Sequence, residues 1–350
     1  MNSVMMKGAF LGMLGTMALL VGCGGGGGSS TFTPPAISNT PVAIDSTNQN
    51  QVANVAENGV SGAISGGVGA VGAVVGGGGQ SFSAVDFIKK TVLGLGDASL
   101  ASGVSGPTGV TISGSCDLGP DGTTGTSSLT TNVANIETTM AFNIGDYATI
   151  SSSNCYDSFD GTTVTGSVTL TMVSGTLDFN LADPLSGGGL SIQISINNLR
   201  STEMGVTTTV HGDVTLTASS GISVSLTGNS LYMMESGGEA VHLTNFAITS
   251  TDYGSYTSTS VNATIASTEI DGVISISTDP SDPLLEDTFA SHPRAGTMTI
   301  TGGSTTLTMV IQDSTTVVLY LDADGVPGTD AGYPATVTWT DIDNSTVIVL

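Results

Sequence analysis

Three aspartates near the C-terminus are the residues whose types and spacing come closest to a ligand site. Asp322, Asp324 and Asp330 lie in a segment that reads DADGVPGTD. Carboxylate and carbonyl oxygens are the ligands that Ca²⁺ prefers, so this loop is a candidate calcium site. Its spacing departs from an EF-hand, because glycine directly follows the second aspartate and Pro327 interrupts the loop. The alternative is a hairpin turn, in which Asp accepts backbone hydrogen bonds and Gly adopts a positive φ.

A second acidic segment, residues 279–287, reads DPSDPLLED. Its two prolines predict an exposed loop in the first place, and an ion site is the alternative.

The histidines do not form a recognisable catalytic motif. His211 and His242 fall in strand-like stretches, and His292 lies beside a proline. The chain contains neither H-E-x-x-H nor G-x-S-x-G, the motifs of zinc proteases and of α/β-hydrolases. A Ser-His-Asp triad assembled in space stays open as an alternative, but we expect no enzyme. Trp339 is expected in a core, with stacking on a sugar ring beside Tyr333 or Tyr320 as the alternative.

A glycine-rich run over Gly59–Gly79 contains GVGAVG at Gly67–Gly72, which matches G-x-G-x-x-G. That fingerprint binds dinucleotides only between a strand and a helix of a βαβ unit, and the flanking sequence predicts neither. We interpret the run as a mobile linker or a glycine-rich hairpin.

From about residue 108 onward, apolar residues alternate with Thr or Ser. This period of two is typical of strands with one buried face, and the short turns between them favour an antiparallel meander. We therefore expect an all-β fold, in which the meander forms a curled, barrel-like sheet or a sandwich. The clearest runs are 164–173, 190–199, 207–218, 222–226, 241–248, 256–265, 269–276, 297–300, 305–311 and 316–321, with turns expected at Gly228-Asn229, Gly237-Gly238, Asp271-Gly272 and Gly302-Gly303.

Helical signals are confined to the part before this β-domain. Helix-compatible residues occur between Ser46 and Glu57, and Ser83–Leu95 has the pattern of a short amphipathic helix with Ser83 as its N-cap. We expect a short N-terminal helical segment.

The first 23 residues have the features of an exported protein. Lys7 is followed by an uncharged, mostly apolar run over Gly8–Val21, which is short for a membrane span. The sequence LVGC at Leu20–Cys23, followed by five glycines, resembles the lipobox of bacterial lipoproteins. That resemblance implies acylation of Cys23 and, because Gly24 stands where inner-membrane lipoproteins tend to have Asp, an outer-membrane location.

These features divide the chain into four parts. They are a signal peptide (1–22), a flexible tether (23–50), a Gly-rich and helical segment (51–107) and an antiparallel β-domain (108–350).

Net charge excludes one class of partner. The chain has 5 basic and 29 acidic residues, a formal charge of −24. Such a polyanion cannot neutralise a phosphate backbone, so we exclude nucleic acid as a partner. Anionic membrane surfaces are disfavoured, whereas divalent cations and basic partners are compatible.

Two cysteines remain once Cys23 is assigned to the lipid anchor. Cys116 and Cys155 form an even pair in an oxidising compartment, which predicts a disulfide.

The C-terminal third resembles a loose family of uncharacterised lipoproteins of Gram-negative bacteria. The residues that carry the resemblance are GTMTITG at Gly296–Gly302, the Asp-rich turn at Asp322–Gly325, and a strand containing Thr338-Trp339-Thr340. The resemblance implies an anchored, export-adapted β-domain and brings no activity with it.

Three classes of function are compatible with these features. The first is a non-enzymatic envelope lipoprotein with a structural, adhesive or interaction role, whose partner is the membrane through the lipid anchor, with a protein or lipid partner in the envelope. The second is a carrier of a lipid or small hydrophobic molecule, and the third is a hydrolase of envelope polymers. We expect no cofactor apart from calcium at the aspartate loop.

Overall fold

The computed structural model describes residues 32–63, 109–134, 141–157, 162–178, 189–203, 205–219, 223–237, 239–287, 290–326, 330 and 332–345. The predicted helix over Ser83–Leu95, the run Gly67–Gly72 and Cys23 lie outside these residues. Among the helices that are described, none has the length and apolar character needed to cross a membrane.

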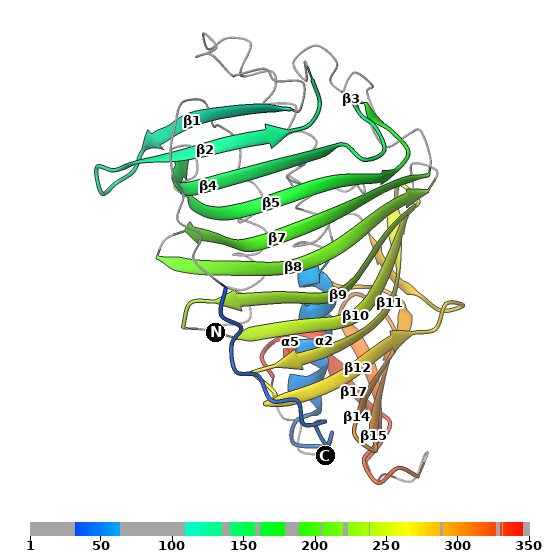
Figure 1. Ribbon diagram of the computed structural model, residues 1–350. Coiled ribbons are helices and arrows are strands. Elements are labelled where there is room, and N and C mark those ends of the chain that lie inside the picture. Colours follow the sequence, from blue (N-terminus) through cyan, green and yellow to red (C-terminus); the bar gives the residue numbers. More distant parts are fainter. Residues whose placement is uncertain are drawn as a thin grey trace.

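One antiparallel sheet of fifteen strands dominates the fold (Figure 1). Nearly all of its neighbouring strands follow one another along the chain, and the path runs from β1 to β17 without closing. This confirms the predicted all-β meander, and the shape it takes is the curled sheet. The strands are β1 (Val110–Leu118), β2 (Thr124–Thr131), β4 (Tyr147–Asp157), β5 (Thr162–Ser174), β7 (Leu190–Glu203), β8 (Val206–Ser219), β9 (Ser223–Glu235), β10 (Ala240–Asp252), β11 (Tyr256–Ser267), β12 (Gly272–Thr278), β13 (Leu284–Asp287), β14 (Gly296–Gly302), β15 (Thr305–Ile311), β16 (Thr316–Asp322) and β17 (Ala335–Thr338), with β3 (Ala141–Phe142) and β6 (Leu177–Asp178) forming a separate small sheet.

Alternation along each strand gives the sheet two chemically different faces. On β8, Val214 and Leu216 are almost fully buried, whereas Asp213 is exposed and Thr215 is half-buried. Val214 and Leu216 belong to the same core cluster as the apolar side chains of helix α2 (Gln49–Ala63). We call the face with this core the inner face and the opposite one the outer face.

Several strands carry a β-bulge, which bends the sheet. Asn154, Asn198 and Asn245 have φ values of 46°, 49° and 48°, and the strand register shifts at each of them. Asparagine tolerates this left-handed conformation better than most side chains. On β8, a Cβ at Gly212 would stand 2.3 Å from the carbonyl oxygen of Ser230, so only glycine lets the two backbones approach this closely.

The turn predicted at Gly228-Asn229 is wrong. Both residues lie inside β9, where the pairing with β8 shifts by one residue between Asp213 and Val214. Gly228 also makes room for the ring of Phe246, whose Cζ would be 2.4 Å from a Cβ at that position. Glycine followed by asparagine therefore serves a bulge here, and the turns predicted at Asp271-Gly272 and Gly302-Gly303 do join strands.

The tether predicted over 23–50 extends too far toward the C-terminus. Thr40 and Val42 exchange backbone hydrogen bonds with Val273 of β12, and the Ile44 side chain is fully buried. These few apolar residues in a polar, Pro-containing segment are sufficient to dock it on the sheet. The helical segment expected after it is confirmed in part as α2, which begins at Gln49.

Helix α2 lies behind the sheet in Figure 1 and packs against β10, β11 and helix α5 (Trp339–Asp343). Residues 52–56 of α2 are all buried, and so is Val60, so this part of the helix is covered over most of its circumference. A helix of this length is stable only when it packs against other elements, and here these are the inner face of the sheet and α5.

The strand expected to contain Thr338-Trp339-Thr340 ends earlier than predicted. β17 stops at Thr338, which becomes the N-cap of α5 and forms a capping box with Asp341. The Thr338 hydrogen bonds also lower the pKa of the Asp341 carboxyl. A threonine followed three residues later by aspartate therefore ends the strand pattern and starts a helix. Trp339 is buried in the core, as predicted.

Candidate functional site

The structure brings the three predicted aspartates together. One carboxylate oxygen from each of Asp322, Asp324 and Asp330 lies within 4.8 Å of the others. Asp322 ends β16, where Thr306 of β15 is its cross-strand partner, and Asp324 and Asp330 lie in the segment that comes after it. The sequence spacing therefore identified a true spatial cluster.

Hydrogen bonds within the loop explain part of this cluster. Asp324 Oδ1 accepts from the Val326 amide at 2.8 Å, and Asp330 Oδ2 accepts from the Ala323 amide at 2.6 Å. Gly325 has a φ of 78°, as the hairpin-turn alternative requires. Asp322 Oδ1 is buried and has no hydrogen-bond partner among the described residues. The carboxylates could hold a hard cation, and calcium here stays a prediction.

The second acidic segment is an exposed turn over residues 279–283 that leads into strand β13 (Leu284–Asp287), which pairs with β11. Asp279 Oδ1 accepts from the Ser281 amide and hydroxyl, which lowers the pKa of this carboxyl. Asp282 accepts from the Thr297 hydroxyl, and Asp287 pairs with Arg294 at 2.8 Å. The prediction of an exposed loop therefore holds for residues 279–283 and is wrong for residues 284–287, which pair with β11 as a strand.

A row of stacked rings on the outer face joins residues that the sequence left apart. His211 of β8, Tyr232 of β9 and His242 of β10 are cross-strand neighbours. Tyr232 and His242 stack with centroids 3.7 Å apart, and Phe32 from the N-terminal segment stacks on His211 at 4.0 Å. Burial lowers the pKa of both imidazoles, although the charge of Asp213 opposes this at His211.

A Ser-His contact extends this row. Ser230 Oγ lies 2.9 Å from His242 Nε2, the separation of a nucleophile and its base. Within the described part of the chain, however, no carboxylate hydrogen-bonds to His242, so the group that would orient the imidazole in a triad is missing. Ser230 and His242 lie on a sheet surface, and their contact also satisfies two half-buried polar groups.

Sequence reasoning missed this row, although a signal for it exists. Residues equidistant from a hairpin turn pair across its two strands. Tyr232 and His242 lie five residues on either side of Gly237, a turn that the sequence did predict. Counting outward from Gly237 along both strands would therefore have placed Tyr232 opposite His242.

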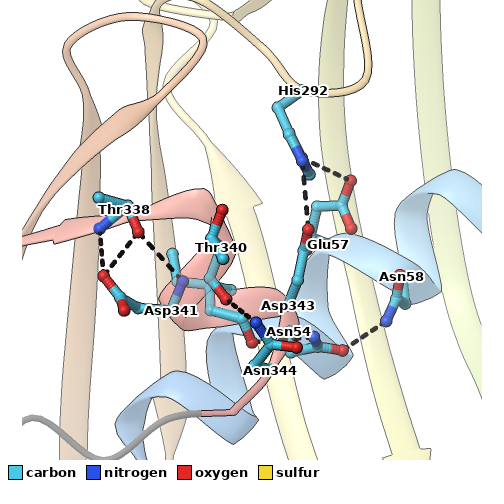
Figure 2. A network of polar contacts seen from close by, with 10 residues as sticks. Asn54, Glu57, Asn58, His292, Thr338, Thr340, Asp341, Asp343 and Asn344 are labelled. Carbon is cyan, nitrogen blue, oxygen red and sulfur yellow. Dashed lines mark hydrogen bonds and ion pairs between the residues drawn. The ribbon is translucent and has the colours of Figure 1, made fainter. Parts of the chain in front are cut away.

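His292 joins a half-buried network of polar contacts with the two helices (Figure 2). Its Nε2 lies 3.3 Å from Asp343 of α5 and its Nδ1 lies 4.0 Å from Glu57 of α2. The ring stacks on Trp339 with centroids 4.7 Å apart, and Asn54 Nδ2 donates to the Ile342 carbonyl at 3.0 Å. The network connects α2, α5 and the loop before β14, so its evident role is to fix the helices on the inner face.

Glu239 and Glu269 lie next to each other at the ends of the central strands, in the turns after β9 and β11. Burial raises the pKa of Glu269 to about 8, and a hydrogen bond and the charge of Glu239 act in the same direction. The Glu269 carboxyl therefore keeps its proton at neutral pH and hydrogen-bonds with Glu239.

The predicted disulfide is confirmed. Cys116 of β1 and Cys155 of β4 are bonded, and both are buried. The bond closes a separation of 39 residues and holds the first strand of the meander to the third. In the chain-entropy model a loop of this length contributes about 4 kcal/mol to stability.

Comparisons with protein-family models, with curated proteins and with solved structures found no match to this chain.

Proposed function

We propose that this protein is a lipid-anchored envelope lipoprotein of a Gram-negative outer membrane, with a non-enzymatic structural, adhesive or interaction role. Acylation of Cys23 holds it at the membrane, and the body presents a large polar sheet surface to partners in the envelope. The support for the anchor is the lipobox-like sequence of the leader.

The observation that favours a structural or interaction role over a carrier is the burial of inner-face side chains on the central strands. Ile192, Ile194, Leu216, Leu231 and Leu243 have no exposed surface, because the chain itself covers them. A carrier needs an apolar lining that its own chain leaves accessible to the ligand. Buried inner-face side chains and a hydroxyl-rich outer face instead favour a protein that contacts its partners through its outer face.

A hydrolase of envelope polymers is the second candidate, because the Ser230–His242 contact favours it. We rank it lower, since the described part of the chain supplies His242 with no orienting carboxylate. Substitution Ser230→Ala tests this candidate on peptidoglycan and on polysaccharide substrates. If wild-type protein cleaves either polymer and the variant does not, the non-enzymatic proposal is wrong.

The experiment that tests the main proposal is mass spectrometry of the full chain, expressed with its leader in a Gram-negative host. We expect removal of residues 1–22, acyl groups on Cys23 and recovery in the outer-membrane fraction. The matched control Cys23→Ala should lack the acyl mass. Native spectra of the extracted protein should show no lipid beyond the covalent anchor, and a stoichiometric lipid adduct would establish the carrier instead.

A further inference from the structure

Residues 32–44 run over the outer face of the sheet and then around its edge to the inner helix. In Figure 1 this dark blue segment begins at the N label near β9, passes in front of β10 and β12, and leads to α2 behind the sheet. We call residues 32–44 the clasp, because this segment contacts the outer face at one end and leads to helix α2 on the inner face at the other.

The first contact of the clasp is aromatic. Phe32 stacks on His211 at 4.0 Å, and its ring centroid lies 5.4 Å from that of Tyr232. His211 is itself held, because its Nδ1 accepts the Asn198 amide at 3.2 Å. Aromatic pairs of this geometry stabilise a contact beyond the area that they bury.

The second contact lies at the start of β12, where the clasp passes the ends of the strands. Pro41 forms a parallel bridge with Val273 of β12, and the Ile44 amide donates to Thr305 Oγ1 at 2.7 Å. Asp45 then accepts from the Thr47 and Asn48 amides before α2 begins. The clasp is thus fixed at both ends, and Phe32 is its last attachment on the side of the anchor.

The Phe32 attachment shortens the chain that joins the body to the anchor. Cys23 and Phe32 are nine positions apart, so at most about 30 Å of chain joins them, whatever its conformation. If only the Phe32 attachment were lost, the chain from Cys23 to Thr40 would be 17 positions long and could span about 58 Å. A body of 319 residues, Phe32–Leu350, has a radius of gyration of about 20 Å, so only the shorter connection restricts which side faces the bilayer.

We propose that the clasp turns the outer face of β8, β9 and β10 toward the membrane, where this face rests on neutral lipid headgroups. This inference rests on the proposed acylation of Cys23 and adds the orientation of the body to it.

The chemistry of the face fits this occupant. Phe32, Tyr232, His211 and His242 combine apolar rings with polar edges, the composition that suits the headgroup region. Burial keeps the pKa of both imidazoles low, so these rings are neutral at neutral pH. The chain carries a formal charge of −24, which repels an anionic surface and leaves zwitterionic headgroups as the matching partner.

The test places one label at each of three positions in a single cross-strand row of the outer face. Thr244 lies on β10 beside the aromatic row, Thr301 on β14 and Thr111 on β1. Seven strand steps separate Thr244 from Thr111, about 34 Å along the sheet. Each is replaced by cysteine in the acylated, disulfide-bonded protein, labelled with a fluorophore and reconstituted in phosphatidylcholine vesicles that contain headgroup spin-labelled lipid.

We expect quenching to be strongest at Thr244 and weakest at Thr111. Phe32→Ala should lower quenching at Thr244 to the Thr111 level while the protein stays bound to vesicles, and the neighbouring exposed control Thr33→Ala should change nothing. Equal quenching at the three positions, or no effect of Phe32→Ala, overturns the orientation although the protein is acylated. Absence of acyl mass on Cys23 overturns the proposed anchor itself, so the two failures are distinguishable.

Discussion

Adjacent residues of each strand lie on opposite faces of the sheet, and the inner face is apolar whereas the outer face is polar. Neighbouring residues form two parallel cross-strand rows, one on each side. The inner row is Leu129, Ile150, Val168, Ile196, Gly212, Leu231, Leu243, Ile265 and Ile274, and the outer row is Thr130, Thr149, Thr169, Ser195, Asp213, Ser230, Thr244, Thr264 and Ser275.

This difference shows where the stability of the fold resides. The inner row is covered by the chain itself, so each side chain removes its apolar area from water. The outer row is joined by hydroxyl contacts such as Thr149 to Thr169 at 2.9 Å and Thr111 to Thr130 at 3.1 Å, which are worth roughly 0.2–1 kcal/mol each. A register slip of one residue would exchange the faces, so the inner row also fixes the register.

The largest expected effect comes from comparing two adjacent residues on β8. Leu216→Ala should lower the free energy of unfolding by about 3 kcal/mol, because it leaves a cavity among fully buried side chains. Thr215→Ala, its neighbour on the outer face, should change it by less than about 0.5 kcal/mol. Urea denaturation of both variants, monitored by circular dichroism, measures the difference. Equal losses would mean that the outer face carries stability by a mechanism other than the hydroxyl contacts.

The faces and most strands were predictable from the sequence, since alternation is a local property that each strand records on its own. The curl was left open, because it depends on bulges. Gly228-Asn229 has the composition of a turn, and only its partners on β8 and β10 show that a bulge forms there. Composition alone does not distinguish the two.

Candidate site residues that lie close together in the sequence were predicted, whereas contacts between distant segments were not. Asp322, Asp324 and Asp330 lie within nine residues, and the disulfide was inferred from cysteine count and compartment. The contact of Phe32 with His211 joins residues 179 positions apart, so no window of sequence contains it. The docking of Ile44 was missed for a similar reason, because one buried isoleucine in a polar segment leaves no periodic pattern.

The stability of the fold should depend on pH through Glu269, which lies in the turn after β11. The folded-state pKa of about 8 exceeds the ordinary value of 4.5, so the folded protein keeps a proton that the unfolded chain releases. The resulting stability is fully present below pH 4.5 and is lost as pH rises toward 8. Solvent screening at this partly exposed pair reduces the loss to on the order of 2 kcal/mol.

Thermal unfolding between about pH 4.5 and 8.5 measures this loss. Glu269→Gln should remove most of the slope, because the neutral amide replaces the protonated carboxyl. Glu235→Gln, on the neighbouring strand β9, should leave the slope as it is in the wild type. A wild-type stability that rises across this range would contradict the raised pKa of Glu269.

The smallest expected effect is at the end of β16, where Asp322 continues the outer row beyond Thr301 and Thr306, and where Asp324 and Asp330 follow in the loop. A calcium ion would relieve the repulsion among Asp322, Asp324 and Asp330, whose oxygens lie within 4.8 Å of one another. Extracellular calcium sites reach a Kd on the order of 1 mM, so about 10 mM Ca²⁺ should stabilise the fold by about 1.4 kcal/mol. Thermal unfolding with and without Ca²⁺ measures this, and Asp322→Asn should abolish the shift. Asp313→Asn is the control, since Asp313 accepts a turn amide from Thr315 at 2.8 Å, as Asp324 does from Val326, but lies in a different hairpin. If calcium shifts wild type and Asp322→Asn equally, the ion binds elsewhere and the loop is only a turn.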